Sequence, residues 1–159
     1  MAGDPHQLRP DHLPTPFTAT EIRDGSRPGR TIRTLVARAG ELPYVRVTRW
    51  VSGDADGGAC DVWTETPDGQ LIEAPERSRA TWLELQAHAS MPAATTTIEA
   101  ETIDIPAGTY DCLRYTRVDG DAVDTFWFAT SAPGAPMRWE KRVGGELVFS
   151  STTIEDVRA

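Results

Sequence analysis

The sequence contains little cysteine, little lysine and no long apolar run. Its two cysteines, Cys60 and Cys112, form no Cys-x-x-Cys motif and have no histidine at metal-ligand spacing, so we expect two free thiols and neither a metal nor another cofactor. Lysine occurs only at Lys141, and the net charge is −8. This charge argues against a nucleic-acid partner, because phosphate binding requires a basic surface. No apolar window reaches the length of a membrane span, so we expect no membrane insertion.

The first residues also lack the apolar segment of a secretory signal, which leads us to expect a cytoplasmic protein. Residues 1–16 are rich in proline and contain His6 and His12. We expect this segment to be a flexible or loosely docked arm. Residues 17–159 then form a single domain, since their number suits one hydrophobic core of ordinary size.

Tight turns are the strongest structural signal. Asp119-Gly120 and Gly144-Gly145 separate runs rich in β-branched and aromatic residues, and both dipeptides suit two-residue hairpins. Pro106-Ala107-Gly108 predicts a third turn. The region 97–155 is therefore expected to be a ladder of antiparallel strands.

Two capping boxes predict helix starts. Thr18 and Glu21 begin a helix of about two turns that ends near Gly25. Thr81 and Glu84 begin a second helix over about 82–89, which Met91-Pro92 ends.

The fold class that follows is mainly β, of the α+β type. We expect a curved antiparallel sheet of about nine strands that forms a half-barrel around the central helix, with a further short helix near the N-terminus. Residues 74–79 show no clear pattern and are expected to be irregular.

The strand 122–129 is apolar on both faces. Alternation places Val123, Trp127 and Ala129 on one face, and Phe126 and Phe128 on the other. A sheet with one solvated face alternates apolar with polar residues, so this strand should be covered on both sides. A helix can supply one cover, and a second layer, a bound ligand or another subunit must supply the other.

Large aromatic residues are numerous on the predicted strands and could line an apolar pocket with a few polar anchors. An ordinary core covered by arginine stems is the alternative interpretation. The candidate pocket residues are Trp50, Trp63, Tyr115, Trp127, Trp139, Arg46, Arg114 and Arg138. Phe126 and Phe128 are the candidates for an interface between two copies of the chain.

The ladder resembles the lipoprotein-carrier (LolA-like) half-barrel group, including its uncharacterised bacterial relatives. The resemblance is carried by Ile105-Pro106-Ala107-Gly108-Thr109-Tyr110-Asp111-Cys112, Thr125-Phe126-Trp127-Phe128-Ala129, Pro133-Gly134 and Gly144-Gly145. It implies a curved antiparallel sheet around a helical plug, with a hydrophobic pocket that can hold an acyl chain. It implies no catalytic residues.

Catalytic arrangements are less favoured. A Cys112–His88 pair is conceivable, but a buried thiol and a surface histidine fit the pattern better. Glu99, Glu101 and Asp104 lie along one strand, as on a solvated edge. We therefore predict non-catalytic binding of an apolar or amphipathic small molecule on the concave face of the sheet. The alternative is a homodimeric interaction protein that uses an apolar sheet face, and an enzyme with a pocket carboxylate comes third.

Overall fold

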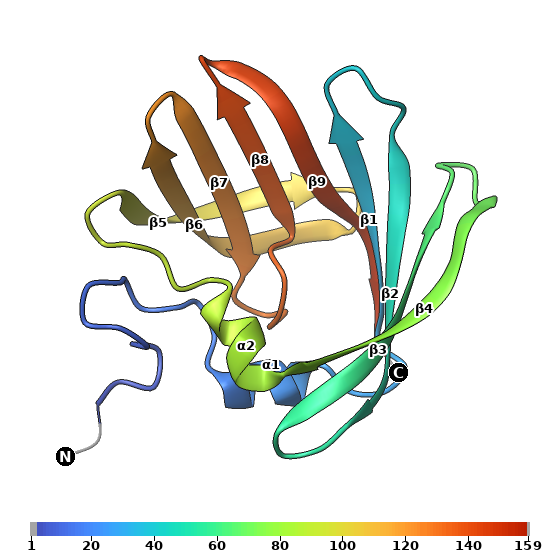
Figure 1. The fold of residues 1–159 in the computed structure, drawn as a ribbon, viewed down its shortest axis with the longest axis horizontal. Coiled ribbons are helices and arrows are strands. Elements are labelled where there is room, and N and C mark those ends of the chain that lie inside the picture. The colour runs from blue at the N-terminus through green and yellow to red at the C-terminus, as the bar shows by residue number, and fades with distance from the viewer. Residues whose placement is uncertain (1–2, 159) are drawn as a thin grey trace.

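The computed structural model describes residues 3–158, and it is mainly β, as predicted. Within these residues nine antiparallel strands form one open sheet in the order β4-β3-β2-β1-β9-β8-β7-β6-β5 (Figure 1). The strands are β1 (Thr31–Arg38), β2 (Tyr44–Gly53), β3 (Gly57–Glu65), β4 (Leu71–Thr81), β5 (Thr96–Ile105), β6 (Gly108–Asp119), β7 (Ala122–Ala129), β8 (Arg138–Val143) and β9 (Glu146–Val157).

Two short helices follow the predicted capping boxes. Helix α1 (Ala19–Gly25) and helix α2 (Trp82–Ala87) each have a threonine N-cap whose side chain accepts the N3 amide hydrogen, while the N3 glutamate accepts from the N-cap amide. The helices lie near the lower ends of the strands, between the two halves of the bent sheet (Figure 1). Both glycines at the β8–β9 turn have positive φ, as a two-residue hairpin requires.

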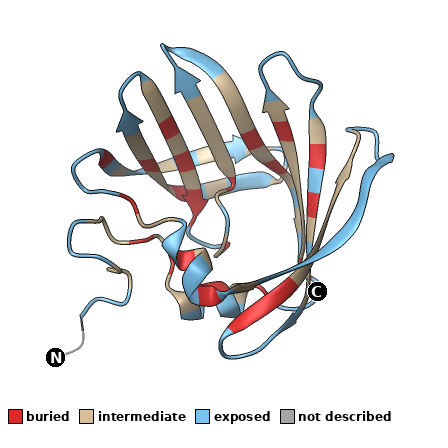
Figure 2. Ribbon diagram, in the orientation of Figure 1, coloured by how far each residue is buried: buried red, intermediate tan, exposed pale blue. Residues whose placement is uncertain are grey.

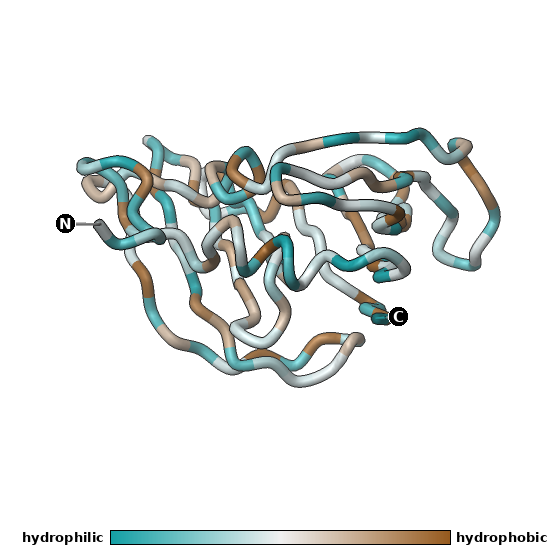
Figure 3. Tube along the Cα trace, turned by 90° about the horizontal axis from the view of Figure 1, so that it is seen from below, coloured by the Kyte–Doolittle hydropathy of each residue, from teal (hydrophilic) through white to brown (hydrophobic). Residues whose placement is uncertain are grey.

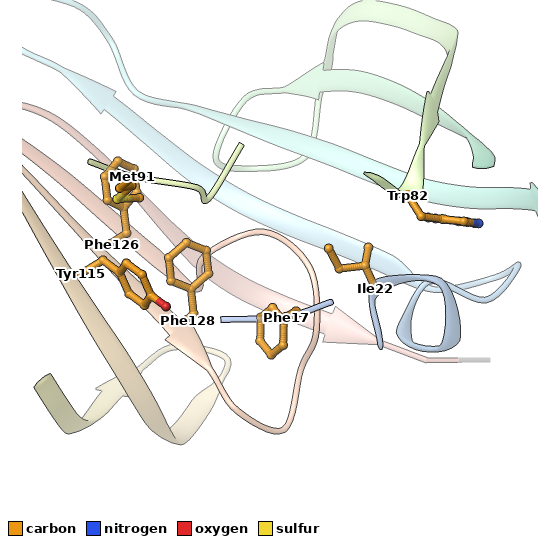
Figure 4. Packing of buried hydrophobic residues seen from close by; sticks show 7 residues of the cluster. All are labelled: Phe17, Ile22, Trp82, Met91, Tyr115, Phe126 and Phe128. Carbon is orange, nitrogen blue, oxygen red and sulfur yellow. The ribbon is translucent and has the colours of Figure 1, made fainter. Parts of the chain in front are cut away.

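A buried cluster fills the space between the helices and the sheet. Its aromatic centre is Tyr115 and Phe128, whose ring centroids lie 5.3 Å apart in an edge-to-face contact. The cluster consists of Phe17, Ile22, Trp82, Met91, Tyr115, Phe126 and Phe128 (Figure 4). We call the sheet face that carries it the helix face, and the opposite face the reverse face.

The reverse face has a smaller buried cluster of its own. It contains Cys112, Ala129, Ala132 and Met137, with Trp127 packed against it. Strand β7 therefore contributes Phe126 and Phe128 to one cluster and Ala129 to the other. On the reverse face only Ala129, at the end of the strand, is buried, against the chain's own β7–β8 loop, whereas Val123, Thr125 and Trp127 are half-buried. The prediction that both faces of this strand are covered therefore holds at one end of the strand only.

Residues 3–16, for which we expected a flexible or loosely docked arm, lie against α2 and β6. The link is Gln86, whose Oε1 accepts from the Ala19 amide at 2.9 Å and whose Nε2 donates to the Pro5 carbonyl at 2.9 Å. The Tyr115 hydroxyl also donates to the Pro14 carbonyl at 2.6 Å. Buried polar groups of the core therefore find their hydrogen-bond partners in the arm.

A buried ion pair joins the two ends of the domain. Arg30 donates to both carboxylate oxygens of Asp156 on β9, at 3.0 and 2.8 Å. Its remaining nitrogen donates to the carbonyls of Gly25 and Pro133, each at 2.7 Å. One guanidinium thus connects the end of α1, strand β9 and the β7–β8 loop.

Residues 74–79 form part of strand β4, so the expectation of an irregular segment was wrong. This strand is exposed along most of its length, because it pairs only with β3 and no helix covers it (Figure 2). It contains Pro75, opposite a break in the β3–β4 register between Val62 and Thr64. Proline and bulges are typical of edge strands. They interrupt the alternation of apolar and polar residues by which a strand is predicted from sequence.

Hydrophobic and hydrophilic residues alternate along the trace in short stretches (Figure 3). Among residues 3–158, no helix has the length and apolar character that crossing a membrane requires.

Burial of Tyr115 leads to a prediction at alkaline pH. Desolvation raises the pKa of Tyr115 to about 12, whereas an unfolded tyrosine titrates near pH ~10. The neutral phenol is therefore favoured in the folded state. Its contribution to stability is complete below pH ~10 and is lost as the pH rises toward ~12. In an ultraviolet titration of tyrosinate, we expect one phenol to ionise only near pH ~12 and Tyr115→Phe to remove that step. A titration curve that Tyr115→Phe leaves unchanged would contradict the assignment.

Candidate functional site

An apolar row crosses the helix face from the core to the far half of the sheet. The strand registers place its residues directly opposite one another from strand to strand, and Phe126 and Trp139 stack with ring centroids 5.3 Å apart. The row runs Ile98, Tyr115, Phe126, Trp139, Ser151, Val36 and Tyr44. Tyr115, Phe126 and Val36 are buried, whereas the two ends of the row, Ile98 and Tyr44, are half-buried. The row therefore leads from the core to a partly open surface.

Tyr44 lines an apolar depression of about 460 Å³ at one end of strands β2 to β4. Leu42 and Ile72 contribute most of the exposed apolar surface there, at 90% and 53% exposure. The lining residues are Leu42, Pro43, Tyr44, Thr64, Thr66, Pro67, Ile72 and Glu73. An apolar lining with a few polar groups is the usual composition of a small-molecule site.

A second depression of about 440 Å³ continues along β3 and β4 and shares Thr64 and Glu73 with the first. It is more polar, since Glu76 and Ser78 line it beside Val62. Trp63 and Arg77 also contact it, where the β-bulge interrupts the pairing of β3 and β4. We call the two depressions together the β2–β4 groove.

Arg46 lies beside this groove. It stands directly opposite Thr64, which in turn stands opposite Glu73, so the three residues form a row across the sheet on the helix face. Arg46 is exposed. Among the described residues it has no ion pair, side-chain hydrogen bond or aromatic ring as a partner, and its guanidinium is available to a ligand.

The predicted pocket residues divide between the two faces. Four of them share the helix face, namely Arg46, Trp50, Tyr115 and Trp139. Tyr115 is fully buried, and Trp50 packs on Trp82 at 5.5 Å, so both belong mainly to the core. The other four, Trp63, Trp127, Arg114 and Arg138, lie on the reverse face. One pocket lined by all eight residues does not form.

The reverse-face residues form a network of their own. The indole of Trp127 and the guanidinium of Arg114 both donate to Oε2 of Glu101, each at 2.8 Å. Arg138 lies over the Trp127 ring at 5.8 Å. The Trp127 hydrogen bond is the main reason that the pKa of Glu101 is lowered, with Arg114 adding to the effect. Every charge in this network has a partner, which is typical of a structural surface.

Trp63 has a similar environment. Its indole donates to Oε2 of Glu65 at 2.9 Å, and Glu65 also binds Arg33. Arg49 lies over the Trp63 ring at 5.0 Å. The indole hydrogen bond again leads the causes that lower the pKa of Glu65.

Phe126 and Phe128, the predicted interface residues, are buried in the main cluster of the monomer. They pack against Tyr115, Trp139 and Phe17. Neither side chain is exposed for contact with a second copy of the chain.

The groups considered for catalysis are dispersed or inert. Cys112 belongs to the reverse-face cluster, whereas His88 caps α2 on the helix face, so the sheet separates them. Burial raises the pKa of the Cys112 thiol to about 11, which leaves it protonated at neutral pH. Both cysteines are free. Within residues 3–158, no group of histidine, cysteine and acidic side chains has the geometry of a metal site.

Several groove residues were not singled out from the sequence. Leu42, Thr64, Ile72 and Glu73 come together only because β2, β3 and β4 pair in a particular register. In the sequence, Thr64 and Thr66 alternate at the end of a strand, the turn Pro67-Asp68-Gly69 follows, and Leu71-Ile72 is a short apolar pair. That signal is too weak to indicate a site.

No protein-family model, no curated protein and no solved structure matches this chain.

Proposed function

We propose that this protein binds an apolar or amphipathic small molecule without catalysis, in the β2–β4 groove. The observation that carries the proposal is the apolar depression at Tyr44, where the row from the core ends beside the unpartnered guanidinium of Arg46. An apolar wall with one free charge suits a ligand that has an apolar body and a polar end.

The proposal treats the bent sheet as a half-barrel, with α2 as the helix on its concave side. The bend in Figure 1 and the burial of Trp82 between helix and sheet support this description. It agrees with the LolA-like resemblance of the ladder, which we retain as a hypothesis about fold and pocket. A cytoplasmic location also remains a hypothesis.

A matched pair of variants tests the site. Ile72 lines the groove, and its neighbour Leu71 has a similar exposure of 60% but does not line it. We expect Ile72→Ala to weaken binding of a hydrophobic probe by roughly threefold to tenfold, since truncation of the side chain removes apolar contact area. Leu71→Ala should leave the dissociation constant unchanged. Isothermal titration calorimetry with an alkyl maltoside below its critical micelle concentration provides the measurement.

Equal affinities for the two variants would move the site away from the groove. Native mass spectrometry of the purified protein adds an independent check, because a co-purifying small molecule would reveal its chemical class. Failure of every hydrophobic probe to bind would overturn the proposal.

Homodimerisation is the second candidate. The observation that favours it is the exposed edge of β4, where Leu71 and Ile72 present apolar side chains next to an unpaired strand backbone. Sedimentation at micromolar concentration tests it, and a monodisperse monomer would remove it.

A further inference from the structure

We propose that the natural ligand of the β2–β4 groove is a zwitterionic amphiphile, with an anionic group held by Arg46 and a cationic group held by Glu73. This inference rests on the proposed function and adds the chemical class of the ligand. It comes from the distribution of charge across the floor of the groove.

The charged row crosses the groove where its two depressions meet. Thr64 and Glu73 line both depressions, and Arg46 stands opposite Thr64 on the neighbouring strand. Arg46 and Glu73 are two strands apart, so their Cα atoms are separated by about 10 Å. A positive group beside the groove, and a hydroxyl and a negative group that line it, therefore follow one another from β2 to β4.

The two charges do not neutralise each other. Among residues 3–158, Arg46 forms no ion pair, and the side chain of Glu73 has one hydrogen bond, from the Thr64 hydroxyl at 3.4 Å. Their neighbours differ in this respect. Arg77 and Asp61, also on β4 and β3, are paired at 2.5 Å. The guanidinium of Arg46 thus retains its planar fork of donors for a ligand, and Glu73 retains one carboxylate oxygen that accepts from no described residue.

The apolar end fixes the orientation of the ligand. Leu42, Tyr44 and Ile72 lie on one side of the charged row and accept the apolar chain. Glu76 and Ser78 lie on the other side, in the more polar depression. A second carboxylate near Glu73, that of Glu76, increases the attraction for a cationic group there.

A ligand with a single charge fits less well. An anion held by Arg46 lies within about 10 Å of Glu73, and a cation held by Glu73 lies equally close to Arg46. This separation is close to the Debye length at physiological salt, so like charges repel and unlike charges attract across the surface. A headgroup that carries both signs satisfies both side chains and meets neither repulsion.

A panel of surfactants with one chain length and four headgroups tests the inference. The probes are an alkyl phosphocholine, an alkyl carboxylate, an alkyl trimethylammonium and a nonionic alkyl maltoside, each below its critical micelle concentration. We expect the phosphocholine to bind roughly tenfold more tightly than each of the others, the gain expected for one additional charge-assisted contact. Calorimetry gives the dissociation constants, and tryptophan fluorescence gives an independent reading.

Variants of the two charged residues separate their contributions. Arg46→Gln should weaken binding of the phosphocholine and the carboxylate by about tenfold without weakening that of the ammonium, and Glu73→Gln should weaken the phosphocholine and the ammonium but not the carboxylate. Arg114→Gln and Glu99→Gln are the matched controls, since both alter charges on β5 and β6 that lie outside the groove. Circular dichroism confirms that each variant is folded.

The outcomes distinguish the zwitterion assignment from the proposed binding function. Equal affinity for all four headgroups, or an effect of Arg46→Gln no larger than that of Arg114→Gln, overturns the zwitterion assignment and leaves the groove as an apolar site. Absence of binding for every probe overturns the proposed function together with this inference.

Discussion

Replacement of Asp156 by Asn is expected to lower the free energy of unfolding by about 3–5 kcal/mol, because it leaves Arg30 as a buried charge without its counter-ion. The two side chains are only 4% and 5% exposed, so water cannot take the place of the lost carboxylate. Arg30→Met should be at least as harmful, because it also removes the donors to the Gly25 and Pro133 carbonyls. Chemical denaturation monitored by tryptophan fluorescence measures both effects.

The exposed pair of Asp61 and Arg77 provides the control. Asp61→Asn breaks a salt bridge in which the arginine is 61% exposed, and solvent screens such a pair so that it contributes little to stability. If Asp156→Asn cost as little as Asp61→Asn, the buried ion pair would not be the link between α1, β9 and the β7–β8 loop that its contacts indicate.

Trp82→Ala is the second substitution with a large expected effect, a loss of about 3–5 kcal/mol in the free energy of unfolding. Trp82 is 3% exposed and lies in the main cluster. Its indole donates to the Asp54 carbonyl at 2.8 Å, and its ring packs on Trp50. Truncation therefore leaves a cavity and also removes the hydrogen bond to the Asp54 carbonyl.

Leu83→Ala serves as the comparison, because Leu83 is the next residue of α2 and is 58% exposed. Its replacement should change stability by less than about 0.5 kcal/mol. Trp82→Phe should lie between the two, since it keeps most of the ring but loses the hydrogen bond. A Trp82→Ala variant as stable as Leu83→Ala would show that α2 is not anchored through this side chain.

The local structure was largely predictable because it depends on neighbouring residues. Thr18 with Glu21 and Thr81 with Glu84 begin helices where the capping boxes place them. The glycines of the Asp119-Gly120 and Gly144-Gly145 turns have the positive φ that those hairpins require. The alternation in β7 assigned Phe126 and Trp127 to the correct opposite faces.

The site was less predictable because it depends on the register between strands. Trp50 and Trp63 are both large aromatics on paired strands, and no sequence pattern distinguishes their positions. The register pairs Trp50 with Cys60 and Trp63 with Val47, which places the two indoles on opposite faces. Alternation with a period of two shows which residues of one strand share a face. It does not show which residues of a neighbouring strand lie on that same face, because this depends on the register between the strands. Residues 74–79 were missed for a related reason, since an exposed edge strand with Pro75 lacks the apolar alternation on which strand prediction depends.

The position of β9 has a consequence for how the protein is made. This strand follows all the others in sequence, yet it lies between β1 and β8 near the middle of the sheet. During synthesis the meanders β1–β4 and β5–β8 emerge first, and each has an edge whose partner has not yet been translated. The two half-sheets can join only when β9 enters between them, so the slow, long-range step of folding comes last. Until then, the unpaired edges of β1 and β8 are the surfaces on which nascent chains are most prone to associate.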